Sequence, residues 1–264
     1  MNHHAELEIR PVSALRDNYV WVLTRPGDPR CAVVDPGQSQ PVLDALERHG
    51  RQLSAILLTH HHPDHVGGVP GLLEQFDVPV HGPDDERLPE AWQRHRDGDR
   101  VRLDALDLEF EVLDIPAHTR SHIAFHGHGL VFPGDTLFSV GCGRLFEGTP
   151  EDMQAALDRL AALPGDTKVY CGHEYTAANC RFALQVEPDN ADLQRRAKQA
   201  ERLSAEGKVT LPSTIAEELE VNPFMRSREP AVVAAARERA PNADPDAAPG
   251  AQVLGIIRSW KDQS

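Results

Sequence analysis

The stretch THHHPDHVGG, from Thr59 to Gly68, places four histidines and one aspartate within ten residues. It follows LSAILL (53–58), a largely apolar run that predicts a buried strand. Imidazole and carboxylate groups together are the ligand set of zinc, manganese and iron. A histidine-rich surface loop is the alternative interpretation. The position of the cluster, after an apolar strand and before a Gly-Gly turn, favours a metal site.

Spacing within this stretch divides the histidines between two directions. Side chains two residues apart on an extended backbone face the same way, so we expect His60 and His62 to point together. His61 is then turned away. Asp64 and His65 follow at once, in the turn, and complete a run of four possible ligands.

One short run cannot fill two metal coordination shells, so further ligands are expected from distant segments. Three polar residues share the context of the first cluster, an apolar strand followed by a turn. They are His118 in DIPAHTRSH, Asp135 in VFPGDTLF and His173 in KVYCGHEYT. Three further histidines lie within or beyond the next strand and are interpreted as structural or solvated: His122, His126 and His128.

Length and composition are those of a globular protein. The 264 residues suffice for one large domain or two modest ones, and 40% of them are hydrophobic. The net charge of −14 repels nucleic acid at long range, so we expect no DNA or RNA partner. A small-molecule substrate is the expected partner.

No targeting or membrane segment is visible in the sequence. The first twenty residues carry charges and lack the apolar core of a secretory signal, and no apolar run approaches the ~18 residues that cross a bilayer. The cysteines at 31, 142, 171 and 180 show no paired short spacing, which predicts free thiols. We therefore expect a soluble, cytoplasmic protein without a membrane partner. The sequence is silent on assembly, and a monomer is the working expectation.

Strand-like and helical segments alternate in the first two thirds of the chain. Short apolar runs such as YVWVLT, CAVVDPG and GLVFPGD alternate with helical stretches such as PVLDALERHG. This alternation predicts an α/β or layered αββα architecture, whose strand-end loops usually carry the active site. The later pattern is helical. We expect a catalytic domain over 1–173 and a helical, substrate-binding domain over 174–264.

The motifs THHHPDH, HTRSH, GDTLF and CGHEY together resemble those of the metallo-β-lactamase superfamily. The match continues through TLFSVGCGRLFEGTPEDM, VYCGHEYTAAN, STIAEELEVNPFMR and the terminal RSWKD. Over nearly the whole chain it is similar to glyoxalase II, the family of hydroxyacylglutathione hydrolases. The resemblance implies an αββα metallo-β-lactamase-like sandwich followed by a small all-helical C-terminal domain.

The resemblance also implies a binuclear metal centre. The ligands of one ion would be His60, His62 and His118. Those of the second ion would be Asp64, His65 and His173, with Asp135 bridging both. Zinc is the expected metal, although the same ligand atoms also serve iron and manganese. Two roles are open to Asp35 in VVDPG: orienting a metal-bound imidazole, or forming the turn before Pro36–Gly37.

Such a centre implies hydrolysis by a metal-bridging hydroxide held by Asp135 and Asp64. Two adjacent metal ions lower the pKa of a shared water from about 15.7 toward neutrality. The hydroxide attacks a thioester carbonyl, and the thiolate departs readily because its parent thiol has a pKa of about 8.5. The implied reaction converts S-D-lactoylglutathione and water to glutathione and D-lactate, a step of methylglyoxal detoxification.

An anionic glutathione moiety requires local cations in so acidic a chain. Arg258 and Lys261, three apart in RSWK, are expected on one face of the last helix, with a solvated helix end as the alternative. Both match glutathione-carboxylate contacts of the family. Arg144 matches a lysine of the family, and Tyr175 matches a tyrosine that contacts the tripeptide. Phe146 replaces a tyrosine, which removes a hydrogen bond worth about 0.5–1.5 kcal/mol and predicts weaker substrate binding.

Other functions share parts of this pattern. A lactonase, a β-lactamase or a nuclease would use the same ligand motif, but the charge disfavours a nuclease and the helical tail a β-lactamase. A mononuclear-iron persulfide dioxygenase would leave His65 and His173 without a metal. LPSTIAEELEVN superficially resembles a helix-turn-helix, but Glu217, Glu218 and Glu220 would face phosphates. A metal-storage or sensing module would bind metal without thioester turnover.

Overall fold

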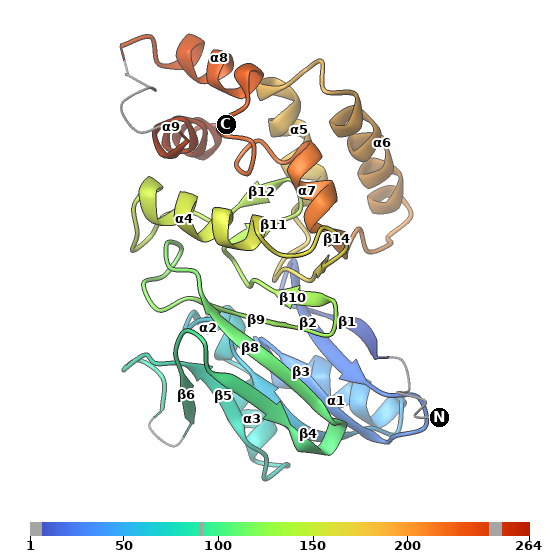
Figure 1. The fold of residues 1–264 in the computed structure, drawn as a ribbon. Coiled ribbons are helices and arrows are strands. Elements are labelled where there is room, and N and C mark those ends of the chain that lie inside the picture. The colour runs from blue at the N-terminus through green and yellow to red at the C-terminus, as the bar shows by residue number, and fades with distance from the viewer. Residues whose placement is uncertain (1–6, 90–91, 243–249) are drawn as a thin grey trace. The chain divides into compact units, whose positions relative to one another are not determined.

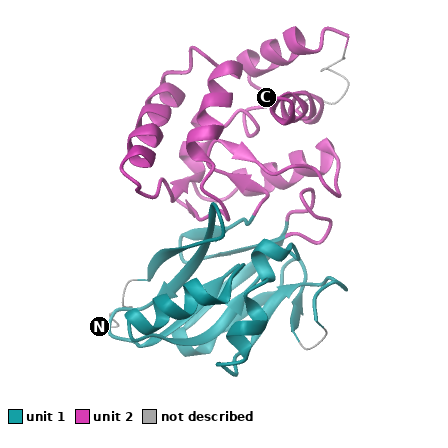
Figure 2. Cartoon of the chain, turned by 180° about the vertical axis from the view of Figure 1, so that it is seen from behind, with its two compact units in different colours: residues 1–114, 123–134 teal, residues 115–122, 135–264 magenta. Residues whose placement is uncertain are grey.

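The computed structural model describes residues 7–89, 92–242 and 250–264, which fall into two compact units (Figure 1). Unit 1 comprises residues 1–114 and 123–134, and unit 2 comprises residues 115–122 and 135–264 (Figure 2). Each unit has its own hydrophobic core. Among the described residues, no helix is both long and apolar enough to cross a membrane.

The first sheet of unit 1 is mixed. Its strands, in spatial order, are β1 (Glu8–Ala14), β2 (Asn18–Thr24), β3 (Arg30–Val34), β4 (Gln52–Leu57), β5 (Val80–Pro83) and β6 (Gln93–His95). The first three strands pair antiparallel, whereas β3 to β6 pair parallel. The carboxyl ends of β3, β4 and β5 therefore meet at one edge of the sheet, where such folds build their sites. Asp35 and the histidine cluster both begin at this edge.

Helices connect the parallel strands of this sheet. They are α1 (Ser39–Arg48), α2 (Pro63–Val66) and α3 (Val69–Leu73). Val42 and Leu46 lie one turn apart on α1, are fully or almost fully buried, and share a core with strand residues such as Val33 and Ile56. Leu72 of α3 belongs to the same core. One face of the sheet is thus covered by helices, as layered packing requires.

A second group of strands in unit 1 pairs antiparallel. In order these are β7 (Arg100–Leu103), β8 (Leu108–Asp114), β9 (Ile123–Gly127) and β10 (Leu130–Phe132), with a short 3-10 helix, η1 (Asp104–Leu106), between β7 and β8. Phe110, Phe125 and Phe132 are completely buried here. His128 and Gly129, with φ of 52° and 74°, make the tight turn between β9 and β10. His128 is therefore a turn residue, in agreement with its structural interpretation.

Unit 2 combines short strands with helices. Its elements are β11 (Leu137–Phe138), β12 (Gly141–Cys142), α4 (Pro150–Ala161), β13 (Lys168–Val169), α5 (Thr176–Val186), α6 (Ala191–Ala205), β14 (Ser213–Thr214), α7 (Ile215–Val221), α8 (Pro230–Arg239) and α9 (Ala251–Asp262). Thr149 and Asp152 form a capping box that starts α4. Val140, from the β11–β12 turn, lies in a core with residues of α5, α6 and α7. The helices of this unit therefore pack around a hairpin that follows Asp135.

Candidate metal centre

Unit 1 gathers four of the predicted ligands at the carboxyl end of β4. His60 is fully buried, and its ring centroid lies 4.7 Å from that of His62 and 4.2 Å from that of His65. The Asp64 Oδ2 atom lies 3.5 Å from Nε2 of His65. Three imidazoles and one carboxylate thus converge on one small region of unit 1.

Asp35 is the buried acceptor that organises this cluster. Its carboxylate accepts hydrogen bonds from the backbone N–H of Thr59 (2.8 Å) and from the Thr59 hydroxyl (2.7 Å). Nδ1 of His65 lies 3.1 Å from the Asp35 Oδ2 atom and donates to it. Nδ1 therefore carries the ring hydrogen, and Nε2 of His65 keeps its lone pair on the side of Asp64.

Thr59 extends the same control to His60. The Thr59 hydroxyl has one hydrogen, which it donates to Asp35, so its oxygen must accept from Nδ1 of His60 at 3.0 Å. Nε2 of His60 is left as the unprotonated nitrogen. One carboxylate therefore sets the tautomer of two imidazoles, and in both cases it is the tautomer that a metal ligand requires. Of the two roles open to Asp35, the structure supports the orienting one.

The Asp35 backbone also takes part in the turn. Its φ is 53°, and its carbonyl accepts from the backbone N–H of Gly37 at 2.9 Å. A Cβ atom on Gly37 would fall 1.9 Å from the Asp64 carbonyl oxygen, so only glycine fits there. On its other side, the Asn18 side chain donates to both the backbone oxygen and Oδ2 of Asp64, each at 3.1 Å. Asp64 is thus fixed in position.

The side chain of His61 points away from this cluster, as expected for the residue between His60 and His62 on an extended backbone. Its Nδ1 lies 3.6 Å from Oδ2 of Asp85, a nearly buried carboxylate that also pairs with Arg87 at 2.7 Å. The HHH run therefore divides between the cluster and a neighbouring ion pair.

Unit 2 brings together the other three predicted ligands. Oδ2 of Asp135 lies 3.6 Å from Nε2 of His118 and 3.3 Å from Nε2 of His173. All three side chains are at least nine-tenths buried. Nδ1 of His118 donates to the carbonyl of Arg144 at 3.0 Å, so its Nε2 carries the lone pair that faces Asp135.

The backbone around Asp135 is held by close contacts within unit 2. Its N–H donates to Nε2 of His122 at 3.1 Å, which gives this buried histidine a structural role. The hydroxyl of Thr136 donates to the carbonyl of Ile115 at 3.1 Å. A Cβ atom on Gly143 would fall 1.9 Å from the Asp135 carbonyl oxygen, so only glycine fits at this position.

The donor chemistry of both groups fits divalent metal ions. Neutral imidazoles presenting Nε2, next to carboxylates, are typical ligands of zinc, iron and manganese. Several such His/Asp clusters are present among the described residues, and they are consistent with a binuclear metal site. The ligand atoms alone do not specify the metal.

Three predicted substrate contacts lie around the unit 2 group. The Tyr175 ring stacks on His173 with centroids 4.7 Å apart and planes 5° from parallel. Phe146 is 61% exposed, and its ring centroid lies 5.1 Å from that of His118. Arg144 is also exposed, with Nε 3.3 Å from the Oδ1 atom of Asp262.

The two basic residues of the last helix are more buried than a solvated helix end would be. Arg258 is only 5% exposed and donates to the carbonyl of Cys142 (2.8 Å) and to Oδ1 of Asp262 (3.0 Å). The solvated-end alternative is therefore wrong for Arg258. Lys261 donates to Oδ1 of Asn179. Burial, aided by the charge of Arg258, lowers the pKa of Lys261 to about 7.

The sequence patterns did not point to several residues that hold the candidate ligands in place. Thr59 could have been recognised from the sequence, because it directly precedes the first candidate ligand and follows an apolar strand. Asn18 and Asn179 carried no such signal, since each acts on residues far away in sequence. Glu218 is completely buried, so it does not face outward as the helix-turn-helix alternative would require.

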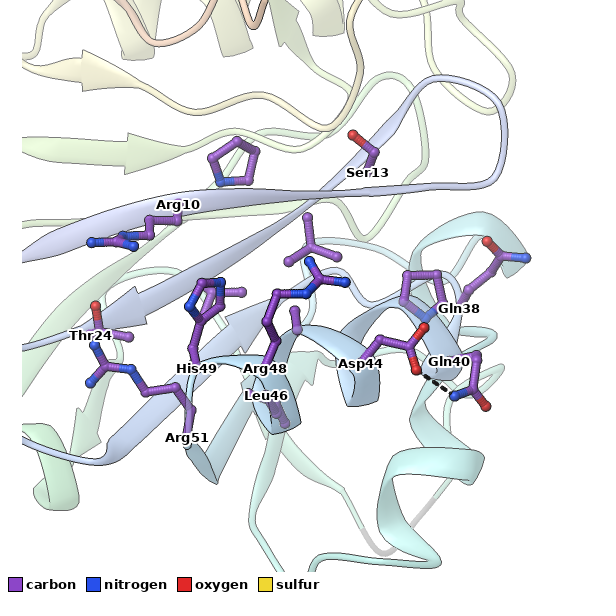
Figure 3. A pocket seen from close by; sticks show the side chains of 15 residues that line it. Arg10, Ser13, Thr24, Gln38, Gln40, Asp44, Leu46, Arg48, His49 and Arg51 are labelled. Carbon is purple, nitrogen blue, oxygen red and sulfur yellow. Dashed lines mark hydrogen bonds between the residues drawn. The ribbon is translucent and has the colours of Figure 1, made fainter.

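A large cavity in unit 1 lies apart from the candidate ligands. It has a volume of about 580 Å³ and lies between α1 and the β1–β2 strands (Figure 3). Arg10, Arg48, His49 and Arg51 line it, together with apolar residues, and none of the candidate ligands does. This cavity is therefore not part of the candidate metal centre. The four cysteines are free and buried, as predicted.

The sequence matches two family models that together cover most of the chain. Residues 15–173 match the metallo-beta-lactamase superfamily, and residues 174–264 match the hydroxyacylglutathione hydrolase C-terminus. The hydroxyacylglutathione hydrolase of Pseudomonas fluorescens (strain SBW25) is 48% identical over 258 residues, which cover 97% of this chain and 99% of that protein.

Solved structures confirm the predicted fold class. ETHE1 from Myxococcus xanthus aligns with a TM-score of 0.65 at 22% identity, covering 96% of this chain and 98% of that one. TTHA1623, solved in a di-iron-bound form, aligns with a TM-score of 0.58 at 26% identity, covering 81% and 99%. The fold is that of a metallo-β-lactamase followed by a helical C-terminal region. The chain belongs to the hydroxyacylglutathione hydrolase family, glyoxalase II, within the metallo-β-lactamase superfamily.

Proposed function

We propose that this hydroxyacylglutathione hydrolase acts chiefly on S-D-lactoylglutathione, through a binuclear metal centre. His60, His62 and His118 would hold one metal ion. Asp64, His65 and His173 would hold the second, and Asp135 would bridge the two. The His/Asp clusters among the described residues support this proposal, because their donor atoms are those that divalent metal ions bind.

The tautomers of the imidazoles are the observation on which the proposal chiefly rests. His60, His65 and His118 each have Nδ1 engaged by a neighbouring oxygen within about 3 Å, so that Nε2 is the available ligand atom. Three such arrangements would be needless in histidines that only fill space. The di-iron-bound form of the related TTHA1623 also supports a two-metal centre.

Bound divalent ions would supply a water that ionises near neutral pH and positive charge for the developing oxyanion. Asp135 and Asp64 would hold that water by accepting its hydrogen. The thiolate product needs little protonation to depart, since the parent thiol has a pKa of about 8.5. A thioester is therefore a better match for these residues than an amide.

The substrate would be held by unit 2 residues around His118 and His173. Arg144, Arg258 and Lys261 would offset the carboxylates of glutathione, and Tyr175 would contact the tripeptide. Phe146 would contribute packing without a hydroxyl. The change of family model at residues 173/174 supports a division into a catalytic domain, 1–173, and a substrate-binding domain, 174–264.

The cellular setting follows from simpler properties. Four free, buried thiols support a reducing compartment, and we place the enzyme in the cytoplasm. A net charge of −14 disfavours attraction to nucleic acid and thereby supports a small-molecule substrate as the partner. We propose that it acts as a monomer with zinc in both sites.

The direct test is hydrolysis of S-D-lactoylglutathione by the purified chain, with metal content measured in the same sample. We expect turnover with two metal ions per chain, and loss of both turnover and metal in His62→Ala. A fully metal-loaded chain without thioester turnover would overturn the proposed function. One iron per chain with persulfide oxidation would instead identify a dioxygenase.

Asp35→Asn tests the control of imidazole tautomers. The Asn oxygen can still accept from the Thr59 N–H, but its amide would donate to the Thr59 hydroxyl and to His65. Both imidazoles would then carry hydrogen on Nε2, so metal affinity should fall about 10–100-fold. Chelator competition measures this loss, and thermal unfolding checks the fold. Asp44→Asn, on exposed α1, is the control. Unchanged affinity in Asp35→Asn would refute the tautomer argument.

Because the pKa of Lys261 is lowered, we expect substrate affinity to depend on pH. Its pKa of about 7 lies below the ordinary lysine value of 10.5, so the positive charge is lost as pH rises through neutrality. KM for the anionic thioester should therefore rise between about pH 6 and about pH 9. Lys261→Arg, which stays charged, should flatten this rise, whereas the exposed Lys198→Arg should not. An equally steep rise in Lys261→Arg would show that another group is responsible.

We expect the Asp262 side chain to compete with the substrate carboxylate for the neighbouring arginines. Its Oδ1 atom faces both Arg258 (3.0 Å) and Arg144 (3.3 Å), so it occupies the place of an anion. Such partly exposed pairs are worth about 0–1 kcal/mol, and Asp262→Asn should lower KM by up to about fivefold. Asp158→Asn, which breaks a pair with Arg228 elsewhere in unit 2, is the matched control. A raised KM in Asp262→Asn would contradict the assignment.

A further inference from the structure

The turn of the β11–β12 hairpin is strained. Val140 has a φ of 59°, in the left-handed region that β-branched residues rarely adopt. This conformation is less favourable than the right-handed one, because the Cβ atom comes too close to the following carbonyl oxygen. It persists because the surroundings hold it, and strain of this kind concentrates at functional sites. The hairpin lies between Asp135 and Arg144 in the chain.

Two buried side chains around α7 hold this turn. Oε2 of Glu218 accepts from the backbone N–H of Val140 at 2.8 Å. The Asn222 amide donates to the carbonyls of Phe138 (3.2 Å) and Gly141 (3.0 Å), and also to Oε2 of Glu218 at 3.0 Å. Both side chains are completely buried. The turn is therefore bound on its N–H and on two of its carbonyls.

Other buried groups of unit 2 complete this clasp. The Asn179 amide donates to the carbonyl of Ser139 at 2.9 Å, and Arg196 donates to the Ser139 hydroxyl at 3.0 Å. Asn179 also accepts from Lys261, and Arg258 donates to the carbonyl of Cys142. The hairpin is thus held by residues of four different helices, one of which, α9, carries two of the cations proposed for the substrate.

A carboxyl group at position 218 requires a reason. Complete burial raises its pKa, which reflects the cost of placing a charge there. Two N–H donors, from Val140 and Asn222, converge on one of its oxygens. That oxygen must accept twice, which a carboxyl or an amide oxygen can do and an apolar side chain cannot.

We propose that Glu218 is a positioning residue of the hydrolase. By holding Val140 in its left-handed conformation, it fixes the hairpin, and through the hairpin the positions of Asp135 and Arg144. This inference rests on the proposed function, because it assigns to Asp135 a metal and to Arg144 a substrate. This role would link the C-terminal region to the proposed centre, although none of the proposed metal ligands lies beyond residue 173.

The test compares two substitutions of Glu218 with a core control. Glu218→Leu should lower kcat/KM about tenfold or more and reduce the metal retained after dialysis. Glu218→Gln keeps a double acceptor and should restore both toward the values of the unsubstituted chain. Val232→Ala truncates a completely buried side chain of α8. It should lower the unfolding temperature while leaving kcat/KM and metal content nearly unchanged. All assays are run below the unfolding temperature of each variant.

Equal metal retention and kcat/KM in Glu218→Leu and Val232→Ala would overturn the proposal, because Glu218 would then only stabilise the fold. If Glu218→Leu does not fold, Asn222→Ser removes the amide that binds Phe138 and Gly141 and is measured in the same way. It must lose more metal than Val232→Ala; equal retention overturns the proposal. Absence of thioester turnover in the unsubstituted chain would instead overturn the proposed function.

Discussion

The hydrogen-bonded carboxylate of Asp35 is the interaction on which the unit 1 cluster depends. It lies at the end of β3, where parallel strands bring it beside the end of β4. Its bonds to Thr59 and His65 decide which nitrogen of two imidazoles keeps the lone pair that a metal ion would need. The edge of the parallel sheet thus presents oriented donor atoms, an arrangement that suits metal binding with little reorganisation.

Unit 2 orients its candidate ligands through different contacts. One oxygen of Asp135 faces two imidazoles, and the carbonyl of Arg144 fixes the tautomer of His118. The chain on either side of this carboxylate is held by glycine-permitted contacts and by the clasped hairpin. Buried polar groups of this kind are costly unless fully bonded, so their presence around the hairpin indicates that its geometry matters.

The sequence pattern indicated which side chains gather better than it indicated what supports them. His60, His62, Asp64 and His65 lie within six residues and follow an apolar strand, so local pattern was enough to group them; the alternation of strands and helices likewise predicted the fold class. Support comes from long-range hydrogen bonds that no local pattern encodes. Glu218 reads as an exposed helical glutamate, yet it bonds to a turn 78 residues away. Arg258 reads as a solvated helix end, yet it is buried against the carbonyl of Cys142.

The proposed ligands would form one centre with two metal ions. Anomalous diffraction from crystals of the zinc-loaded protein tests it most directly. We expect two peaks about 3.5–4 Å apart, with Asp135 between them, with His60, His62 and His118 around one peak and Asp64, His65 and His173 around the other. A single peak, or peaks without Asp135 beside them, would refute the two-metal centre.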